Sequence, residues 1–450
     1  EIIERHPERL QEVPDIGPKR SRLIAMAWEQ QKQVKEIMLF LHSHGVSTNL
    51  AIKIYKQYGD AALQVVQTDP YRLAQDIYGI GFRTADKIAQ ALGLPTDHPS
   101  RIEAGLVYVL NEMSNEGHVY APREILTERA IELLGVSPDL IPEAIQRLAN
   151  NDRIRLDWVA ENDGGSGSTH SGQVSESHPS YGPQSYAYIL PPGHSAVYLT
   201  PYYHGETSVA ERLRSLAAAQ TPLSQQASRM AVNDISLSAE QLSAVRAALT
   251  HPVSVLTGGP GTGKTTTVKA LIAALESSGK RYALASPTGR AAKRLSEATG
   301  RPASTIHRLL GPSPTEGFKF NAQNPLPIDF LVLDEASMLD LLLANHLLKA
   351  LQPGTHLLLV GDVDQLPSVG AGDVLRDVIA SGLAPVTRLS VIFRQAASSL
   401  IITNAHRINQ GQMPLFPAND PESGDPGGDF FLFPAETPEE TAEWVEKVVC

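Results

Sequence analysis

The sequence contains one cysteine and no long apolar run, and its opening residues are polar. Cys450 has no partner for an intrachain disulfide, which favours a reducing compartment. No apolar segment approaches the roughly 20 residues that a transmembrane helix needs. The opening residues, EIIERHPERLQEV, are too polar for a secretory signal. We therefore expect a cytoplasmic protein of several domains that makes no contact with a membrane.

The chain also lacks the excess of positive charge that is typical of nucleic-acid-binding proteins, because its formal net charge is −11. Residues 411–450 carry nine acidic residues against Lys447 alone, a balance of −8. The rest of the chain is nearly neutral and can form local basic patches. Because the chain opens with Glu1 instead of Met and stops at Cys450 just after a predicted helix, we expect it to be a fragment.

Residues 1–100 contain an internal repeat. The segment 2–25 aligns with the segment 65–89, so that Gly17 matches Gly81, and a weaker copy lies at 42–59. Each copy predicts a helix, a short glycine turn and a second helix.

The third copy carries the clearest candidate for a DNA contact. Gly79 and Gly81 open a predicted helix with exposed backbone N–H groups, which can hold a DNA phosphate without reading sequence. Basic residues follow the first and third turns, namely Lys19, Arg20, Arg83 and Lys87. These copies resemble helix-hairpin-helix DNA-binding modules. The alternative is a helical bundle whose glycines end the helices.

Residues 101–219 predict a domain similar to a winged helix. Three amphipathic helical segments are followed by an alternating strand at 153–160, whose expected partner is 196–200. The Gly- and Ser-rich segment 161–185 between these strands predicts a flexible insert. Such a domain can bind DNA or protein or act as a spacer, and the scarcity of basic residues on its third helix favours a spacer or a protein contact. We expect 220–236 to be a linker.

The pattern changes at residue 237. Apolar β segments alternate with helical segments from there to about residue 394, which predicts a parallel sheet covered by helices on both faces. Ligands of such sheets bind at the C-terminal ends of the strands.

The segment 253–267, VSVLTGGPGTGKTTT, reads as a strand, a glycine-rich loop and a helix start. It fits the pattern G-x-x-x-x-G-K-[ST], in which backbone N–H groups surround phosphates. Lys264 would bind the β- and γ-phosphates, and the Thr265 hydroxyl would bind Mg²⁺. The nucleotide-binding residues that the loop predicts are Gly258, Gly259, Pro260, Gly261, Thr262, Gly263, Lys264, Thr265 and Thr266.

A second buried strand ends in two acidic residues. In FLVLDEASM, Asp334 would hold Mg²⁺ and Glu335 would orient and deprotonate the attacking water. The alternative is that these residues merely cap the helix that follows. Beside a phosphate loop, the pair favours hydrolysis over binding alone.

Two further segments, 285–297 and 304–311, pair a strand end with hydroxyl side chains and a basic helix. Such groups can hold the phosphates of a nucleic-acid strand, although a solvated amphipathic helix is the alternative. The ordered series of segments resembles superfamily 1 helicases and is closest to the RecD-like branch, in the long form with helix-hairpin-helix repeats. The segments that carry this resemblance are LSAEQLSAV, GGPGTGKTTT, ASPTGRAAKRL, STIHRLLG, VLDEASM, LVGDVDQLPSVGAGDVL and VIFRQA.

The resemblance assigns roles to further residues. It implies that Gln241 reads the adenine, that Gln365 contacts the γ-phosphate or attacking water, and that Arg394 is an arginine finger. The catalytic set is then Lys264, Glu335, Gln365 and Arg394. The implied contacts to the DNA backbone are Ser286, Thr288, Thr305 and His307.

The resemblance also implies a multidomain fold: an α-helical helix-hairpin-helix and winged-helix-like region, then an α/β RecA-like P-loop NTPase domain at 237–394. Residues 395–450 would begin a second RecA-like domain and lack its later motifs. Residues 311–327 lie where the family inserts a β-hairpin pin that splits strands, and a surface loop is the alternative.

The implied function is an ATP- and Mg²⁺-dependent helicase that moves 5′ to 3′ on single-stranded DNA, with a role in DNA repair or recombination. Its partners would be single-stranded DNA and junctions of single- and double-stranded DNA, and protein partners could bind the N-terminal domains. We expect a monomer. The alternatives are a DNA-stimulated ATPase switch that loads or remodels partners, and an RNA helicase of the same superfamily.

Overall fold

The structure is a computed structural model of the chain, and it describes residues 6–13, 16–43, 46–158, 195–227, 230, 237–313, 317–391, 399–416 and 429–449. The chain divides into two compact units. The N-terminal unit ends at Thr200, and the C-terminal unit begins at Pro201 and also includes Ser114–Val119. In the described ranges, no helix is both long and apolar enough to cross a membrane.

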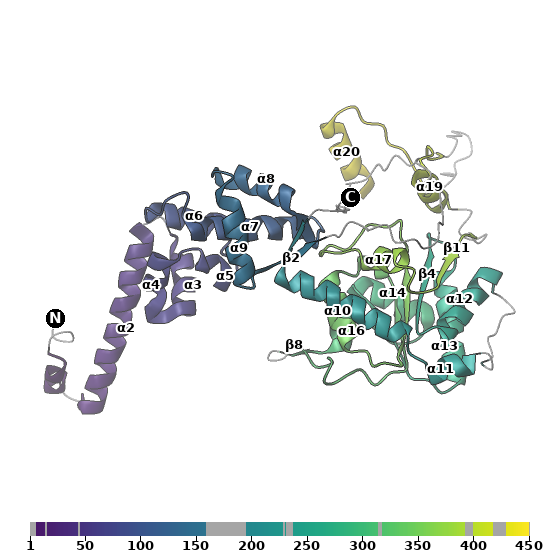
Figure 1. The fold of residues 1–450 in the computed structure, drawn as a ribbon, viewed down its shortest axis with the longest axis horizontal. Helices are drawn as coiled ribbons and strands as arrows, with labels where there is room; N and C mark the ends of the chain where they lie inside the picture. Colours follow the sequence, from purple (N-terminus) through teal and green to yellow (C-terminus); the bar gives the residue numbers. More distant parts are fainter. Residues whose placement is uncertain are drawn as a thin grey trace. The chain divides into compact units, whose positions relative to one another are not determined.

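The N-terminal unit opens with helices of the repeat region (Figure 1). Ile54, Val66, Leu73 and Ile88 are buried together and join these helices into one hydrophobic cluster. The helices are α2 (Pro18–Ser43), α3 (Thr48–Tyr58), α4 (Ala62–Thr68), α5 (Arg72–Asp76) and α6 (Phe82–Ala91).

A mixed α/β segment follows and has the element order of a winged helix. Its elements are α7 (Pro99–Asn115), β1 (Tyr120–Pro122), α8 (Arg123–Leu134), α9 (Leu140–Asn150), β2 (Ile154–Trp158) and β3 (Ser195–Leu199). The three strands form an antiparallel sheet in the order β1-β3-β2. The predicted pairing of 153–160 with 196–200 is confirmed, with Leu156 opposite Val197. The predicted insert 161–185 lies outside the described residues.

Helix α6 belongs to two hydrophobic clusters at once. Ile88 is part of the repeat cluster, whereas Phe82 and Ala85 pack with Leu106 and Ile145 in the cluster of the winged-helix-like segment. Helix α6 therefore packs against both the repeat region and the winged-helix-like segment, and the boundary expected near residue 100 stays a prediction.

The C-terminal unit is built on a six-stranded parallel sheet in the order β11-β4-β10-β9-β5-β6. Its strands are β4 (Val253–Gly258), β5 (Tyr282–Ser286), β6 (Ala303–Thr305), β9 (Phe330–Leu333), β10 (His356–Gly361) and β11 (Val386–Leu389). The predicted parallel sheet is confirmed. Strand β10 lies between β4, which leads into the glycine-rich loop, and β9, which leads into Asp334 and Glu335.

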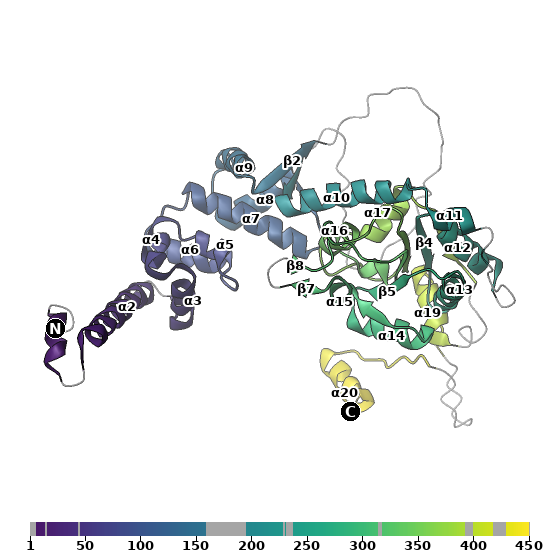
Figure 2. The same ribbon diagram turned by 90° about the horizontal axis from the view of Figure 1, so that it is seen from below.

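Helices cover both faces of this sheet because its strands are apolar on both sides. In β10, Leu357 and Leu359 belong to one hydrophobic cluster and Leu358 and Val360 to the other. Figure 2 shows helices α10 and α13 on opposite sides of β4. The helices of the domain are α10 (Thr200–Ala217), α11 (Pro222–Gln226), α12 (Ala239–Thr250), α13 (Lys264–Ser277), α14 (Gly289–Thr299), α15 (Ile306–Leu310), α16 (Leu341–Lys349) and α17 (Val374–Ala380).

Two segments expected upstream of the ATPase domain pack against its sheet. Helix α10 contributes Val209 and Leu213 to the core of the C-terminal unit. Within the predicted linker, Thr221 is buried and its Oγ1 lies 2.6 Å from Nε2 of His356. The compact C-terminal unit thus starts near residue 200, earlier than the expected boundaries at 219 and 237.

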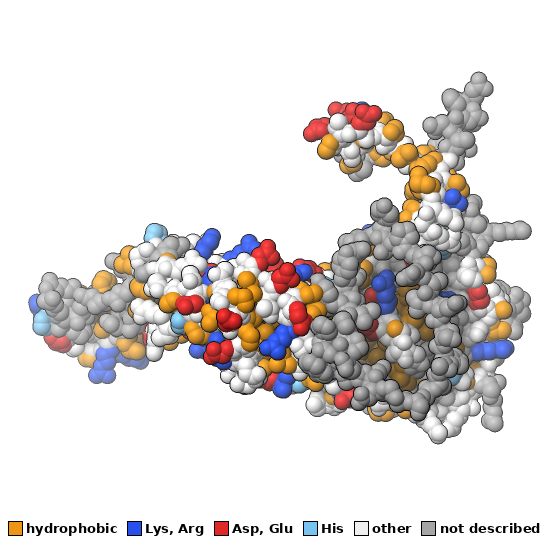
Figure 3. All heavy atoms as spheres, turned by 45° about the horizontal axis from the view of Figure 1, so that its top comes forward, with side chains coloured by type: hydrophobic (Ala, Val, Ile, Leu, Met, Phe, Trp, Pro, Cys, Tyr) orange, Lys and Arg blue, Asp and Glu red, His pale blue; other side chains and the backbone are white. Residues whose placement is uncertain are grey.

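The hairpin region and the acidic C-terminal segment complete the unit. The two short strands β7 (Pro312–Ser313) and β8 (Gly317–Phe318) pair antiparallel. Helices α19 (Leu400–Asn409) and α20 (Pro438–Val449) follow β11 in the chain. Figure 3 shows acidic side chains gathered on α20, which matches the concentration of negative charge in residues 411–450.

Candidate nucleotide-binding site and DNA-contact residues

The glycine-rich loop joins the C-terminal end of β4 to the first turn of α13. Gly261 and Gly263 have φ angles of 77° and 88°, a conformation that favours glycine. A Cβ atom on Gly258 would lie 2.8 Å from the carbonyl oxygen of Leu389, so a side chain does not fit there. The buried Thr262 closes the loop, because its hydroxyl donates to the carbonyl of Gly259 at 2.8 Å. Helix α13 therefore starts with free N–H groups beside a tight loop, as phosphate binding requires.

Lys264, Thr265 and Thr266 form the start of α13. Nζ of the half-buried Lys264 donates to the carbonyl oxygens of Gly258 and Gly259, the latter at 3.1 Å. Thr265 and Thr266 are exposed at the helix start. The structure therefore brings a cation, hydroxyl groups and backbone donors together at one point. These are the groups that bind the phosphates of a nucleoside triphosphate.

Asp334 and Glu335 follow the C-terminal end of β9, which is separated from β4 by β10. Burial and the adjacent carboxylate of Glu335 raise the pKa of Asp334 to about 6, and Lys264 acts in the opposite direction. Glu335 has a φ angle of 54°, which is rare for a residue with a side chain and costs on the order of 1–3 kcal/mol. Such strain is typical of functional sites.

The donor set fits Mg²⁺. A carboxylate on Asp334 and a hydroxyl on Thr265 are hard oxygen ligands, and a bound cation would favour the charged form of the desolvated Asp334. Among the described residues, no group of three or more His, Cys, Asp or Glu side chains could hold a metal ion by itself. The protein would thus supply only some of the ligands of a Mg²⁺ ion, and phosphate oxygens would supply others, which is the usual arrangement in nucleotide sites.

Gln365 follows β10 at the same edge of the sheet. The buried Asp362 fixes the turn, because its carboxylate accepts from the N–H of Asp364 at 3.1 Å and from Nε2 of Gln365 at 3.4 Å. Since β10 lies between β4 and β9, Gln365 stands at the sheet edge from which both Lys264 and Asp334 project.

Gln241 lies buried at the start of α12. Its carboxamide forms a capping box with Ser238 and donates to the carbonyl of Gly263 at 3.4 Å. The structure thus connects Gln241 to the glycine-rich loop, and its predicted role in reading adenine stays a prediction.

Arg394 lies outside the described residues, so its role as an arginine finger also stays a prediction. Sequence reasoning missed a contact beside that segment. The carboxylate of Glu240 accepts from the N–H of Ser390 at 2.9 Å and from its hydroxyl at 2.6 Å, which lowers the pKa of Glu240. The contact connects the first turn of α12 to the chain that leaves β11, and the two residues are too far apart in sequence for any motif to reveal it.

The predicted DNA contacts of this unit lie at the ends of β5 and β6. Thr288 and Thr305 are the N-cap residues of α14 and α15, so their oxygens accept backbone N–H groups and their O–H groups can donate. His307 is exposed on α15. Ser286 is fully buried, and its hydroxyl has no hydrogen-bond partner within the described ranges.

The hairpin β7–β8 is anchored by its aromatic side chains. The ring of Phe318 lies between those of His307 and His346, with centroid distances of 5.8 and 5.0 Å. Phe318 and Phe320 both pack against the core of the sheet. These phenylalanines therefore hold the base of the hairpin.

In the N-terminal unit, Gly79 and Gly81 form the turn before α6. Gly79 has a φ angle of 88°, and Gly81 is the N-cap residue of α6. Lys53 of α3 reaches this turn, because its Nζ lies 3.4 Å from the carbonyl oxygen of Tyr78. The Tyr78 side chain is 99% exposed. The turn thus combines N–H donors, an ammonium group and an open aromatic ring.

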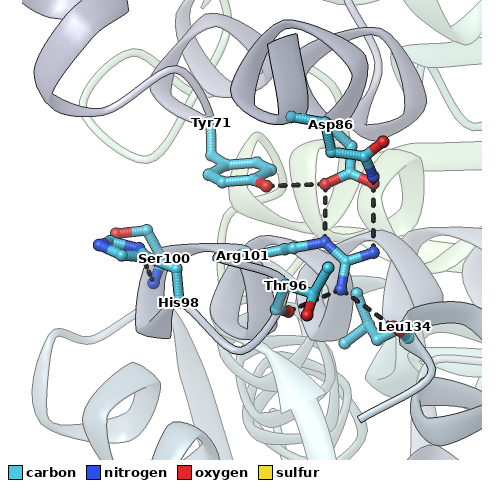
Figure 4. Close-up of polar contacts among 8 residues, drawn as sticks. Tyr71, Asp86, Thr96, His98, Ser100, Arg101 and Leu134 are labelled. Atoms are coloured by element: carbon cyan, nitrogen blue, oxygen red, sulfur yellow. Dashed lines mark hydrogen bonds and ion pairs between the residues drawn. The ribbon is translucent and has the colours of Figure 1, made fainter. Parts of the chain in front are cut away.

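A buried ion pair fixes α6 behind this turn (Figure 4). Arg101 on α7 donates to both carboxylate oxygens of Asp86, at 2.8 and 3.3 Å, and also to the carbonyls of Thr96 and Leu134. The hydroxyl of Tyr71 donates to Asp86 at 2.7 Å, and burial together with Asp86 raises the pKa of Tyr71. The helix after the candidate DNA turn is therefore locked to the winged-helix-like segment.

Comparison with known proteins agrees with both halves of this picture. Residues 30–120 match the family described as the ATP-dependent RecD2 DNA helicase HHH domain, and residues 241–371 match an AAA domain family. The predicted resemblance to RecD-like superfamily 1 helicases is confirmed. The fold of this RecD-like chain is a helix-hairpin-helix and winged-helix-like region followed by a RecA-like P-loop domain.

Curated relatives of the RecD-like chain extend the match. The ATP-dependent RecD2 DNA helicase of Deinococcus radiodurans is 36% identical over 422 residues, which are 92% of this chain and 55% of that protein. The RecBCD enzyme subunit RecD of Mycolicibacterium smegmatis is 43% identical over 39% of this chain and 36% of that protein. A crystal structure of Pif1 helicase from Candida albicans is 26% identical, with a TM-score of 0.32 over 40% of this chain and 45% of that one. The chain thus spans about half the length of its RecD2 relative.

Proposed function

We propose that the protein is an ATP-dependent DNA helicase that moves 5′ to 3′ along single-stranded DNA, acting as a monomer in the cytoplasm in DNA repair or recombination. The observation that carries this proposal is the arrangement of Lys264, Glu335 and Gln365 at one edge of a RecA-like sheet. The similarity to the ATP-dependent RecD2 DNA helicase of Deinococcus radiodurans supports the ATP-dependent DNA helicase activity in this proposal.

In the proposed reaction, N–H groups of the glycine-rich loop and Lys264 bind the phosphates of ATP. Mg²⁺ held by Thr265 and Asp334 would neutralise charge on the phosphates. Glu335 accepts a proton from the attacking water, and Gln365 orients that water or the γ-phosphate. Arg394 stabilises the charge that develops on the transferred phosphoryl group.

Movement along single-stranded DNA is proposed to follow from the binding and hydrolysis of ATP at the same edge of the sheet. Gln365 is followed by an exposed loop, and the candidate DNA residues Thr288, Thr305 and His307 lie at the ends of neighbouring strands. The hairpin β7–β8 would meet the duplex at the junction. The turn at Gly79 and Gly81 would hold DNA phosphates without reading sequence.

Unwinding of tailed duplexes tests this proposal. The full-length protein with ATP should separate a duplex that carries a 5′ single-stranded tail and leave a matched 3′-tailed duplex intact. Preference for the 3′ tail would contradict the polarity. ATP hydrolysis that DNA stimulates without separating either duplex would contradict the helicase and favour an ATPase switch, and stronger stimulation by RNA would favour an RNA helicase.

A further inference from the structure

The first helix after β11 contacts the glycine-rich loop through one side chain. His406, in the last turn of α19, lies against Gly259, so that a Cβ atom on Gly259 would be 2.4 Å from Cε1 of the ring. Nε2 of His406 lies 3.4 Å from the carbonyl oxygen of Pro260. The two residues are 146 positions apart in the sequence.

Both the start and the buried side of α19 form hydrogen bonds with the chain that follows the helix. At its start, the carboxylate of Asp429 accepts from the N–H groups of Leu400 and Ile401, at 2.7 and 3.2 Å. On its buried side, Asn404 forms two hydrogen bonds to the main chain of Leu415, at 2.6 and 2.7 Å. These contacts join α19 to residues that follow it in the chain, and His406 extends from this helix to the glycine-rich loop.

The contact engages the carbonyl side of the loop. Lys264 binds the carbonyls of Gly258 and Gly259, and His406 is within reach of the next carbonyl, that of Pro260. When the ammonium group of Lys264 turns to a phosphate, the Thr262 hydroxyl still holds the carbonyl of Gly259, and His406 is the side chain within reach of the carbonyl of Pro260. When the carbonyl groups of the loop are held in place, its peptide planes keep the orientation in which their N–H groups point towards an anion.

We propose that His406 is a positioning residue for the glycine-rich loop, contributed by the helix that follows β11. The inference rests on the proposed ATP site, and adds to it that ATP affinity depends on α19 lying against the loop. The imidazole donates its Nε2 hydrogen to the carbonyl of Pro260, and its ring fills the space above Gly259. Neither ring nitrogen takes part in the chemical step.

Substitutions of His406 test the two parts of this contact. His406→Ala should weaken the binding of a fluorescent ATP analogue about fivefold, the equivalent of one ordinary hydrogen bond, and raise KM for ATP more than it lowers kcat. His406→Gln can supply a donor at a similar reach and should restore most of the affinity. Gln410→Ala, at the end of the same helix, is the matched control. Equal affinity for ATP in His406→Ala and the native protein would overturn the proposal.

A double-mutant cycle isolates the contact from other roles of Gly259. Gly259→Ala should weaken ATP binding more in the native background than in the His406→Ala background, because only the native background holds a ring 2.4 Å from the new methyl group. Identical losses in both backgrounds would show that the ring does not lie on the loop.

Lys264→Ala separates this proposal from the ATP site on which it rests. Loss of ATP binding in Lys264→Ala together with no change in His406→Ala would overturn the role of His406 and leave the ATP site intact. Unchanged binding in Lys264→Ala would overturn the ATP site, and the role of His406 with it.

Discussion

The two units of the protein hold their candidate sites in different ways. In the C-terminal unit, the site residues leave three neighbouring strands that are buried on both faces, so many apolar contacts fix their positions. In the N-terminal unit, the candidate DNA turn lies between two short helices, and the second of them is held by its apolar face and by the buried ion pair between Asp86 and Arg101. The difference teaches that the ATP site should tolerate the loss of one supporting contact better than the DNA turn.

The largest expected effect is loss of the ATP site with the DNA turn intact. Lys264→Ala should reduce ATP hydrolysis by at least about 10²- to 10³-fold, because it removes the cation that faces the phosphates. Binding of single-stranded DNA to the N-terminal unit should persist. Steady-state hydrolysis and fluorescence anisotropy measure the two properties, and a parallel loss of both would show that the sites are not separate.

Glu335→Gln should separate ATP binding from ATP hydrolysis within the ATP site. Without a general base, hydrolysis should fall by about 10²- to 10⁴-fold while ATP binding persists, because the amide cannot accept the proton. Single-turnover hydrolysis and ATP binding are the measurements. Hydrolysis at the native rate would contradict the assignment of Glu335.

In the N-terminal unit, Asp86→Ala should destabilise the repeat region by about 3–5 kcal/mol, because it leaves the buried Arg101 without its partner. Thermal unfolding followed by circular dichroism measures the loss. Asp76→Ala is the matched control, since its partner Arg72 is exposed and the pair is a surface one. Equal effects of the two substitutions would contradict the account of a lock at α6.

The contribution of His356 to the stability of the C-terminal unit should fall in mild acid. Burial lowers the pKa of His356 below its usual 6.5, so the folded state favours the neutral ring and the unfolded state binds more protons. The contribution is complete above pH 6.5 and falls as the pH drops from there towards the lowered folded-state pKa. Chemical unfolding at a series of pH values measures it, and in His356→Asn the slope in this range should be smaller.

The smallest effect concerns Lys53 at the DNA turn. Lys53→Ala should weaken binding of single-stranded DNA severalfold and reduce the salt dependence of binding by about one phosphate contact. Lys56→Ala, another exposed lysine of α3, controls for net charge. Equal losses in the two variants would show that Lys53 has no special position.

Sequence reasoning predicted the local backbone around most residues of the candidate nucleotide site, because these residues follow strands at fixed short spacings. The loop from Gly258 to Thr265 and the pair Asp334–Glu335 each lie within a few residues of a buried strand. The chemistry expected of each can be inferred from its own short stretch of sequence. The internal repeat could also be recognised from short stretches of sequence. A motif read in one stretch of sequence predicts the local backbone well.

Local sequence patterns did not predict how these segments are arranged in space. The position of β10 between β4 and β9 depends on strand order, which no local pattern specifies. The contacts of Thr221 with His356 and of His406 with Pro260 join residues 135 and 146 positions apart. The packing of α10 on the sheet and the contacts of α6 with two clusters likewise depend on tertiary contacts, which local sequence patterns do not specify.

The rate of ATP hydrolysis with and without single-stranded DNA tests the central claim most directly, because it requires a working ATP site that responds to DNA. The account predicts that saturating single-stranded DNA raises kcat of the full-length protein and that Lys264→Ala abolishes the rate in both conditions. An equal rate with and without DNA, in a protein that binds both ligands, would contradict it.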